Sequence, residues 1–183
     1  AYIILENFTV RGGALHAIEV RSCNQVRILA ADLSGWGRVG TAVFNLGGKY
    51  RDARGSTINN DAGVFVNRAS NTVIERCWVH DPAGHSNPWD AAHPLGFAAT
   101  HPAGPNAVFM RSLGAAVIRW NDFTGSEGHR WNDAIEGWNN GGPTGGFYRD
   151  ADIHGNFLAF GQDDGIEMDG GQMNVRFFGN KVE

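Results

Sequence analysis

The chain lacks the features that mark membrane-spanning, nucleic-acid-binding and disulfide-stabilised proteins. None of its 183 residues belongs to an apolar run near the roughly 18 residues of a membrane span, and no signal peptide opens the chain. Only two lysines occur, Lys49 and Lys181, and the net charge is −4, which disfavours nucleic acids and anionic membranes as partners. The two cysteines, Cys23 and Cys77, have no metal-site spacing and are expected to be buried thiols.

A short pattern, in contrast, is present six times. The pattern spans eight positions. Apolar residues occupy the first, third and eighth positions, and a turn residue occupies the sixth. A short strand-like run precedes five of the six: His16–Val20, Gly63–Val66, Ala107–Met110, Ala134–Gly137 and Gly165–Met168. The six registers are Tyr2/Ile4/Asn7/Thr9, Val26/Ile28/Ala31/Leu33, Thr72/Ile74/Cys77/Val79, Ala116/Ile118/Asn121/Phe123, Ala151/Ile153/Asn156/Leu158 and Val175/Phe177/Asn180/Val182. Repeats of this kind are typical of solenoids.

Each unit offers three strand runs with period-two alternation, and 26 of the 183 residues are glycine, which suits a fold of strands and turns. We therefore expect an all-β fold, a right-handed parallel β-helix (solenoid) of about six coils, in a single domain over residues 1–183. Each strand would bond to its counterpart about 4.8 Å away in the next coil. The recurring Asn is expected at a bend with left-handed geometry, its side chains bonded along a column. An antiparallel sandwich or barrel is the alternative fold, but it would not repeat one register.

The turn residues, at 7, 31, 77, 121, 156 and 180, lie 24, 46, 44, 35 and 24 positions apart. A spacing of 24 is a bare coil, and longer intervals indicate loop insertions near residues 34–60, 80–106, 124–132 and 137–149. Because insertions of a repeat fold gather on one face, they predict walls around a groove whose floor is the first strand of each coil. The repeat begins and stops inside a coil, which indicates a fragment of a longer β-helix protein.

Acidic residues gather on this predicted groove floor. When the first strands are aligned on Ile18, Val64, Val108, Ile135 and Ile166, the next, outward position reads Glu19, Phe65, Phe109, Glu136 and Glu167. The last two coils add Asp133, Asp163, Asp164 and Asp169 to the same side. Like charges this close raise pKa values and are seldom kept without use. They suit acid–base chemistry on a glycosidic bond, or calcium binding.

Aromatic side chains in and beside the insertions match the apolar faces of sugar rings. With neighbouring polar residues they form the expected substrate-binding set: Trp138, Asp169, Phe109, Arg111, Trp131 and Tyr148. The loop histidines, among them His101 and His129, do not have the tight spacing of a zinc site.

Together, these features resemble the pectin-lyase-like superfamily of right-handed β-helix proteins, whose members are mostly polysaccharide lyases and glycoside hydrolases. The resemblance covers essentially the whole chain through its repeat. It implies an active groove on the first-strand face, a polysaccharide or oligosaccharide substrate, and an extracellular or periplasmic location. Some members are phage tailspikes, so a non-catalytic glycan-binding or tailspike-like β-helix protein stays open as an alternative.

A narrower resemblance is to polygalacturonase-type hydrolases, which carry Asn-x-Asp-Gly-Ile-Asp and Gly-Asp-Asp on neighbouring coils. This chain has Asn132-Asp133-Ala134-Ile135-Glu136 and then Gly161-Gln162-Asp163-Asp164. The resemblance implies catalytic roles for Asp133, Asp163 and Asp164, as acid and base, with inversion. The first run is one residue short, a Gln intrudes before the aspartate pair, and the family's His-Gly and Arg-x-Lys motifs are absent.

Two enzyme functions follow from the acids. As a glycoside hydrolase, the chain would use Asp133, Asp163, Asp164, Glu136 and Glu167 as acid and base, without a cofactor. As a polysaccharide lyase it would hold Ca²⁺ through Asp164, Glu167 and Asp169, with an arginine as base, the candidates being Arg111, Arg149 and Arg176. We favour hydrolysis, because cations are few near the acids.

Overall fold

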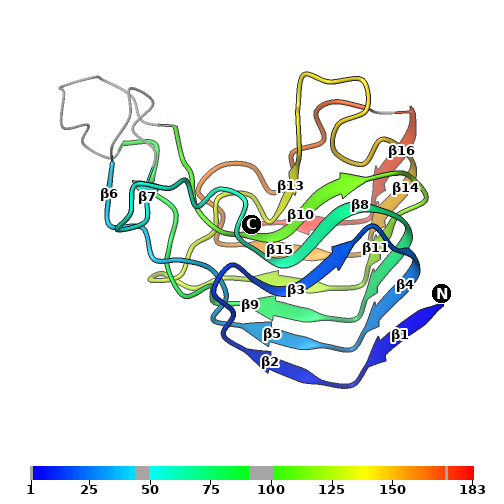
Figure 1. The fold of residues 1–183 in the computed structure, drawn as a ribbon, viewed down its shortest axis with the longest axis horizontal. Helices are drawn as coiled ribbons and strands as arrows, with labels where there is room; N and C mark the ends of the chain where they lie inside the picture. Colours follow the sequence, from blue (N-terminus) through cyan, green and yellow to red (C-terminus); the bar gives the residue numbers. More distant parts are fainter. Residues whose placement is uncertain (1, 44–49, 91–100, 172) are drawn as a thin grey trace.

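The computed structural model describes residues 2–43, 50–90, 101–171 and 173–183. Within these ranges the chain is all-β, with seventeen strands and no helix, and hence no helix suited to crossing a membrane. The strands form sheets of nine, six and two members (Figure 1). All neighbours in the two larger sheets are parallel. The expected all-β class with parallel strands is therefore confirmed.

The nine-stranded sheet contains two rows of strands. The first row runs in the order β1–β4–β8–β11–β14–β16, formed by Ile3–Glu6, Asn24–Leu29, Ala62–Glu75, Val117–Arg119, Arg149–His154 and Met173–Phe178. The second row is β3–β8–β10–β13, in which β3, β10 and β13 are His16–Arg21, Asn106–Ser112 and Ile135–Gly137. Strand β8 belongs to both rows because its 14 residues run without a break through two of the predicted strands.

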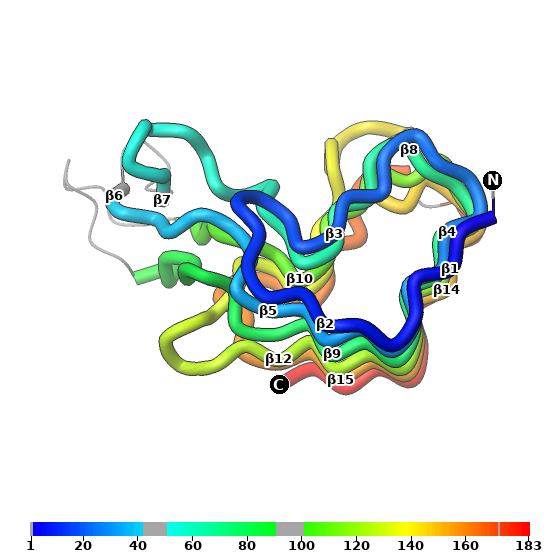
Figure 2. The backbone as a smooth tube through the Cα atoms, turned by 60° about the horizontal axis from the view of Figure 1, so that its bottom comes forward, coloured from blue at the N-terminus to red at the C-terminus, as the bar shows by residue number. Residues whose placement is uncertain are grey.

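The six-stranded sheet has the order β17–β15–β12–β9–β5–β2. Its members are Lys181–Val182, Phe157–Ala159, Asp122–Thr124, Trp78–His80, Asp32–Ser34 and Thr9–Arg11. A separate antiparallel hairpin, β6 (Ala42–Val43) with β7 (Tyr50–Arg51), lies in the first predicted insertion. Figure 2 shows that successive passes of the chain overlie one another around a common interior, while this hairpin lies to one side.

The strand registers agree with five of the six predicted patterns. Ile28, Ile74 and Ile118 are neighbours along one row, and the row continues through Ile153. The first pattern is wrong by one residue, because Ile3 pairs with Val26 and Val10 with Leu33. The predicted strand Gly165–Met168 is also wrong, since it makes only an isolated bridge from Ile166 to Ile135.

An asparagine column joins neighbouring units. The amide of Asn121 donates to Oδ1 of Asn156 at 2.9 Å, and that of Asn156 donates to Oδ1 of Asn180 at 2.8 Å. The predicted side-chain ladder is therefore confirmed for these three residues. Their own backbones are not left-handed, however. The left-handed residue is the one before the column in each unit: Asn7, Ala30, Arg76, Trp120, Gly155 and Gly179.

The interior is filled by the inward aliphatic columns and by two tryptophans. Trp36 and Trp131 are fully buried and stack with ring centroids 6.4 Å apart. Both cysteines are unpaired, and burial raises the pKa of the Cys77 thiol. Cys23, expected to be buried, is only partly so. The core thus fixes the strands whose outward residues form the candidate site.

Candidate functional site

The outward column of the second strand row has the predicted alignment. Phe65 pairs with Phe109, which pairs with Glu136, and the bridge from Ile135 to Ile166 brings Glu167 next to Glu136. At the other end, Glu19 pairs with Phe65. Because residues in register point to the same face of parallel strands, the column presents two aromatic rings followed by two acids.

A cavity of about 380 Å³ lies over the acidic end of this column. Glu136, Glu167 and Phe109 form part of its lining, and no lysine or arginine belongs to the described lining. The other lining residues are five asparagines, Asn59, Asn60, Asn132, Asn139 and Asn140, together with His101, Gly137 and Trp138. The cavity is therefore rich in amides, with carboxyl groups as its acidic component.

Three carboxyl groups meet at and beneath the floor of this cavity. Asp133, Glu136 and Glu167 each bring an oxygen within 4.8 Å of the other two, and the first two side chains are almost entirely buried. Burial is the main cause that raises the pKa of Asp133 to about 7, and burial together with the neighbouring carboxyl groups Glu167 and Asp133 raises the pKa of Glu136 to about 11. Glu136 therefore holds a proton at neutral pH.

Asp133 lies beneath the cavity and does not line it. Its Oδ2 accepts a hydrogen bond from the amide of Asn132 at 2.6 Å, and its Oδ1 accepts one from the backbone N–H of Asp164 at 2.8 Å. Asn140 donates a hydrogen bond to Glu167. Both oxygens of Asp133 are thus engaged, whereas Glu136 and Glu167 face the cavity.

The structure also brings together the three aspartates suggested by the polygalacturonase resemblance. Oxygens of Asp133, Asp163 and Asp164 lie within 4.8 Å of one another. Asp164 is exposed, while Asp163 is partly buried, and this burial raises the pKa of Asp163. None of the three belongs to the described lining of the cavity, in which Glu136 and Glu167 are the acids.

The predicted substrate-binding residues are brought together only in part. Trp138 and Phe109 line the cavity, and the Arg111 guanidinium lies 3.9 Å from the centre of the Trp138 ring. The prediction for Trp131 is wrong, because its side chain is fully buried in the core. Tyr148 lies in a separate depression with Gly171 and Met173.

Asp169, assigned both to substrate and to a calcium site, is exposed and does not line the cavity. The structure groups carboxylates that could hold a cation as Asp133, Glu136 and Glu167, and as Asp133, Asp163 and Asp164, but does not group Asp164, Glu167 and Asp169. The other two arginine candidates are engaged elsewhere. Arg176 forms an ion pair with Asp152, and Arg149 lies over the ring of Tyr148.

Sequence reasoning missed the five asparagines and His101. Four of the five asparagines form two dipeptides in the sequence, Asn59-Asn60 and Asn139-Asn140. Each lies beside a first strand, the first pair just before β8 and the second just after β13. Their position next to the predicted groove floor could have identified these asparagines as candidate site residues. His101 gave no comparable signal, because its place depends on how the second insertion folds back.

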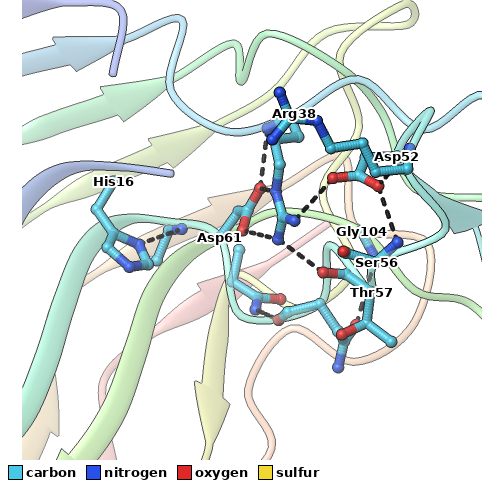
Figure 3. A network of polar contacts seen from close by, with 11 residues as sticks. His16, Arg38, Asp52, Ser56, Thr57, Asp61 and Gly104 are labelled. Carbon is cyan, nitrogen blue, oxygen red and sulfur yellow. Dashed lines mark hydrogen bonds and ion pairs between the residues drawn. The ribbon is translucent and has the colours of Figure 1, made fainter. Parts of the chain in front are cut away.

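A partly buried ion network holds one wall of the cavity in place (Figure 3). The Arg38 guanidinium donates to both oxygens of Asp61, at 2.7 and 2.9 Å, and to Oδ2 of Asp52 at 3.0 Å. Asp61 is almost fully buried and immediately precedes β8. The same wall is bonded to β10, because Asn106 donates its amide to the carbonyl of Asn59 at 2.6 Å. These contacts fix the backbone that carries Asn59 and Asn60.

Comparisons of the chain with protein-family models, with curated proteins and with solved structures find no match.

Proposed function

We propose that the chain is a right-handed parallel β-helix of about six coils, with the architecture of the pectin-lyase-like superfamily. The support is the strand order: each row pairs a strand with its counterpart one repeat later, in parallel, at a register that is constant apart from one shift between Arg111 and Ser112 of β10. The asparagine column, which bonds unit to unit, agrees with this arrangement.

Within that fold we propose a glycoside hydrolase whose acid is Glu136 and whose second carboxylate is Glu167. The observation that carries the proposal is the pairing of these two side chains in one amide-rich cavity, with the proton held on Glu136. A protonated carboxyl group can protonate the leaving oxygen of a glycosidic bond, while an ionised one assists on the sugar carbon. This replaces the aspartate trio with two glutamates as the reacting pair.

The remaining lining is suited to sugar hydroxyl groups. The five asparagines supply amide donors and acceptors, and Trp138 and Phe109 supply ring faces. Arg111 stacks on Trp138 and steadies that ring against the groove. Because no lysine or arginine lines the described cavity, a sugar without a carboxylate fits it better than a uronate. Such a substrate implies action outside the cytoplasm or in the periplasm.

The separation of the carboxyl groups favours retention of configuration at the sugar carbon. Inverting glycosidases hold their carboxyl groups roughly 6.5–9.5 Å apart to admit a water molecule, whereas retaining ones hold them about 5–5.5 Å apart. The nearest oxygens of Glu136 and Glu167 lie within 4.8 Å of each other and the two side chains are hydrogen-bonded, so this pair lies below the inverting range. We therefore assign Glu167 as the nucleophile, in contrast to the inversion implied by the polygalacturonase resemblance.

The test is a panel of plant and algal polysaccharides, followed at once for reducing ends and for the ultraviolet absorbance of unsaturated products. We expect reducing ends without that absorbance. Glu136→Gln and Glu167→Gln should each lower the rate by at least about 10³-fold, since each removes a reacting group. Asp122→Asn, an exposed acid of the six-stranded sheet, is the matched control and should leave the rate unchanged. Sugar binding without turnover in the parent would indicate a glycan-binding protein instead.

A calcium-dependent polysaccharide lyase is the second candidate, because three carboxyl groups converge within 4.8 Å. Such oxygens suit Ca²⁺, which takes six to eight oxygen ligands, and asparagine carbonyls beside them could supply more. Against it, both oxygens of Asp133 already accept hydrogen bonds from protein donors. Unsaturated products that disappear with a chelator and return with calcium would establish this candidate and overturn hydrolysis.

A further inference from the structure

A histidine stands at the rim of the cavity, beside a carboxylate that does not line it. His101 lines the cavity together with Glu136 and Glu167, and half of its side-chain surface is exposed. Its Nδ1 lies 2.8 Å from the carbonyl oxygen of Pro102 and 3.6 Å from Oδ2 of Asp163. No other histidine belongs to the described lining of this cavity.

These contacts determine which ring nitrogen carries the proton. A carbonyl oxygen only accepts hydrogen bonds, so Nδ1 of His101 must be the donor to Pro102. The Asp163 carboxylate on the same side reinforces this choice. In the neutral ring the proton is then on Nδ1, and Nε2 is left with a free lone pair. The ring of Trp89, with its centroid 4.8 Å away, helps to hold the imidazole in place.

We propose that His101 is the general base of the hydrolytic half-reaction in this cavity, with Asp163 as its positioning residue; this rests on the proposed glycoside hydrolase. Nε2 takes a proton from the water whose oxygen bonds to the sugar carbon. The ester bond from that carbon to Glu167 breaks, and its electron pair returns to the Glu167 carboxylate. The imidazolium then releases the proton to solvent, which the exposed ring can reach, and Glu136 regains from solvent the proton that it gave to the leaving oxygen. The titratable groups that contact the ring or share the cavity with it are Asp163, Glu136 and Glu167.

The first measurement needs no substrate. Imidazole ¹⁵N shifts of the histidine-labelled protein, assigned with His101→Asn, should show the Nδ1–H tautomer for His101 at a pH where the ring is neutral. His129 is a matched reference, because its Nδ1 also lies 2.8 Å from a carbonyl, that of Pro82, away from the cavity. An Nε2–H tautomer at His101 would overturn the proposal.

The second measurement follows turnover of the cleaved polysaccharide. His101→Asn should lower kcat by about 10²-fold, as expected for loss of a general base, and KM should fall in the same proportion, because only breakdown of the intermediate is slowed and kcat/KM stays unchanged. The glycosyl-enzyme on Glu167 should accumulate and be visible as added mass, and azide, which needs no base, should restore its breakdown. Asp163→Asn should lower kcat by a smaller factor than His101→Asn, again with recovery by azide, and His129→Asn should change nothing.

The two proposals fail in different ways. No cleavage of any polysaccharide by the parent would overturn the hydrolase and the role of His101 with it. An active parent with an unchanged His101→Asn rate, or a slow variant that neither accumulates the intermediate nor responds to azide, would overturn the role of His101 alone.

Discussion

The asparagine column allows a quantitative prediction about stability. The side chain of Asn156 is 2% exposed and takes part in four hydrogen bonds. Its Oδ1 accepts from the backbone and side-chain N–H groups of Asn121 at 3.0 and 2.9 Å. Its amide donates to the carbonyl of Ile118 at 3.0 Å and to Oδ1 of Asn180 at 2.8 Å. Asn156→Ala removes all four bonds at once.

The expected cost follows from the groups left behind. The backbone N–H of Asn121 and the carbonyl of Ile118 would remain in the interior without these partners, and each such group costs about 1–3 kcal/mol. Partial relaxation of the surrounding turns offsets some of this, so we expect a loss of about 3–5 kcal/mol in the free energy of unfolding. Domains are stable by only about 5–15 kcal/mol, so the loss is a large fraction of the total.

The matched control is Asn180→Ala, at the last position of the same column. Asn180 is only half-buried, so water can replace part of its bonding, and we expect a loss of about 1 kcal/mol. Urea unfolding followed by tryptophan fluorescence, with the slope held common to both variants, gives both numbers. Equal losses below about 1 kcal/mol would refute the reasoning, because they would show that the ladder contributes no more than surface hydrogen bonds.

Three further predictions concern the wall, the acid and the core. Arg38→Met leaves the buried carboxylate of Asp61 without its ion-pair partner and should cost about 2–4 kcal/mol in a urea titration, whereas adding Asp61→Asn should recover part of that loss. Since burial raises the pKa of Glu136 to about 11, the folded protein binds more protons than the unfolded chain above about pH 4.5, and stability falls as pH rises. Glu136→Gln should therefore be more stable than the parent by about 1–3 kcal/mol at pH 8 in thermal unfolding, with a gap that closes at pH 4; a gap independent of pH would contradict this. Gly63→Ala should cost about 1–3 kcal/mol by the same urea assay, because its Cβ would lie 2.5 Å from a side-chain carbon of β9; wild-type stability would show that the strands can move apart there.

The repeating strands could be read from the sequence because the inward positions carry a period that only a stacked register satisfies. Ile28, Ile74 and Ile118 recur with the same offset from the turn residue, and the structure pairs them directly. The register prediction failed for the first unit because Ile3, Ile4 and Leu5 are apolar in succession. The alternation of apolar and polar residues therefore cannot distinguish between two registers. The choice is made by the neighbouring strand β4, which the pattern within one unit does not contain.

The acids of the site could be found in the same way, but not their roles. Strand register placed Glu136 and Glu167 in one outward column. It could not show that Asp133 turns beneath the floor, since that depends on the two hydrogen bonds that its carboxylate accepts. Trp131 was misplaced for a related reason: a residue beside an insertion can point inward, and this one packs on Trp36. Periodicity therefore predicts where the strands lie, whereas contacts with the loops decide where the side chains beside the strand ends point.

The buried carboxyl groups of the site lower the stability of the fold locally, and the rest of the fold tolerates this loss. Two nearly buried carboxyl groups, Asp133 and Glu136, lie where most folds would place apolar side chains, and their raised pKa values measure how strongly that environment opposes their ionisation. The surrounding structure is unusually well bonded, with donors from Asn132 and the backbone of Asp164 fixed on Asp133. A purely structural role would be served equally by a neutral amide at position 136. If Glu136→Gln folds with higher stability at neutral pH and loses turnover, the carboxyl group is retained for its proton, which is the property that hydrolysis requires.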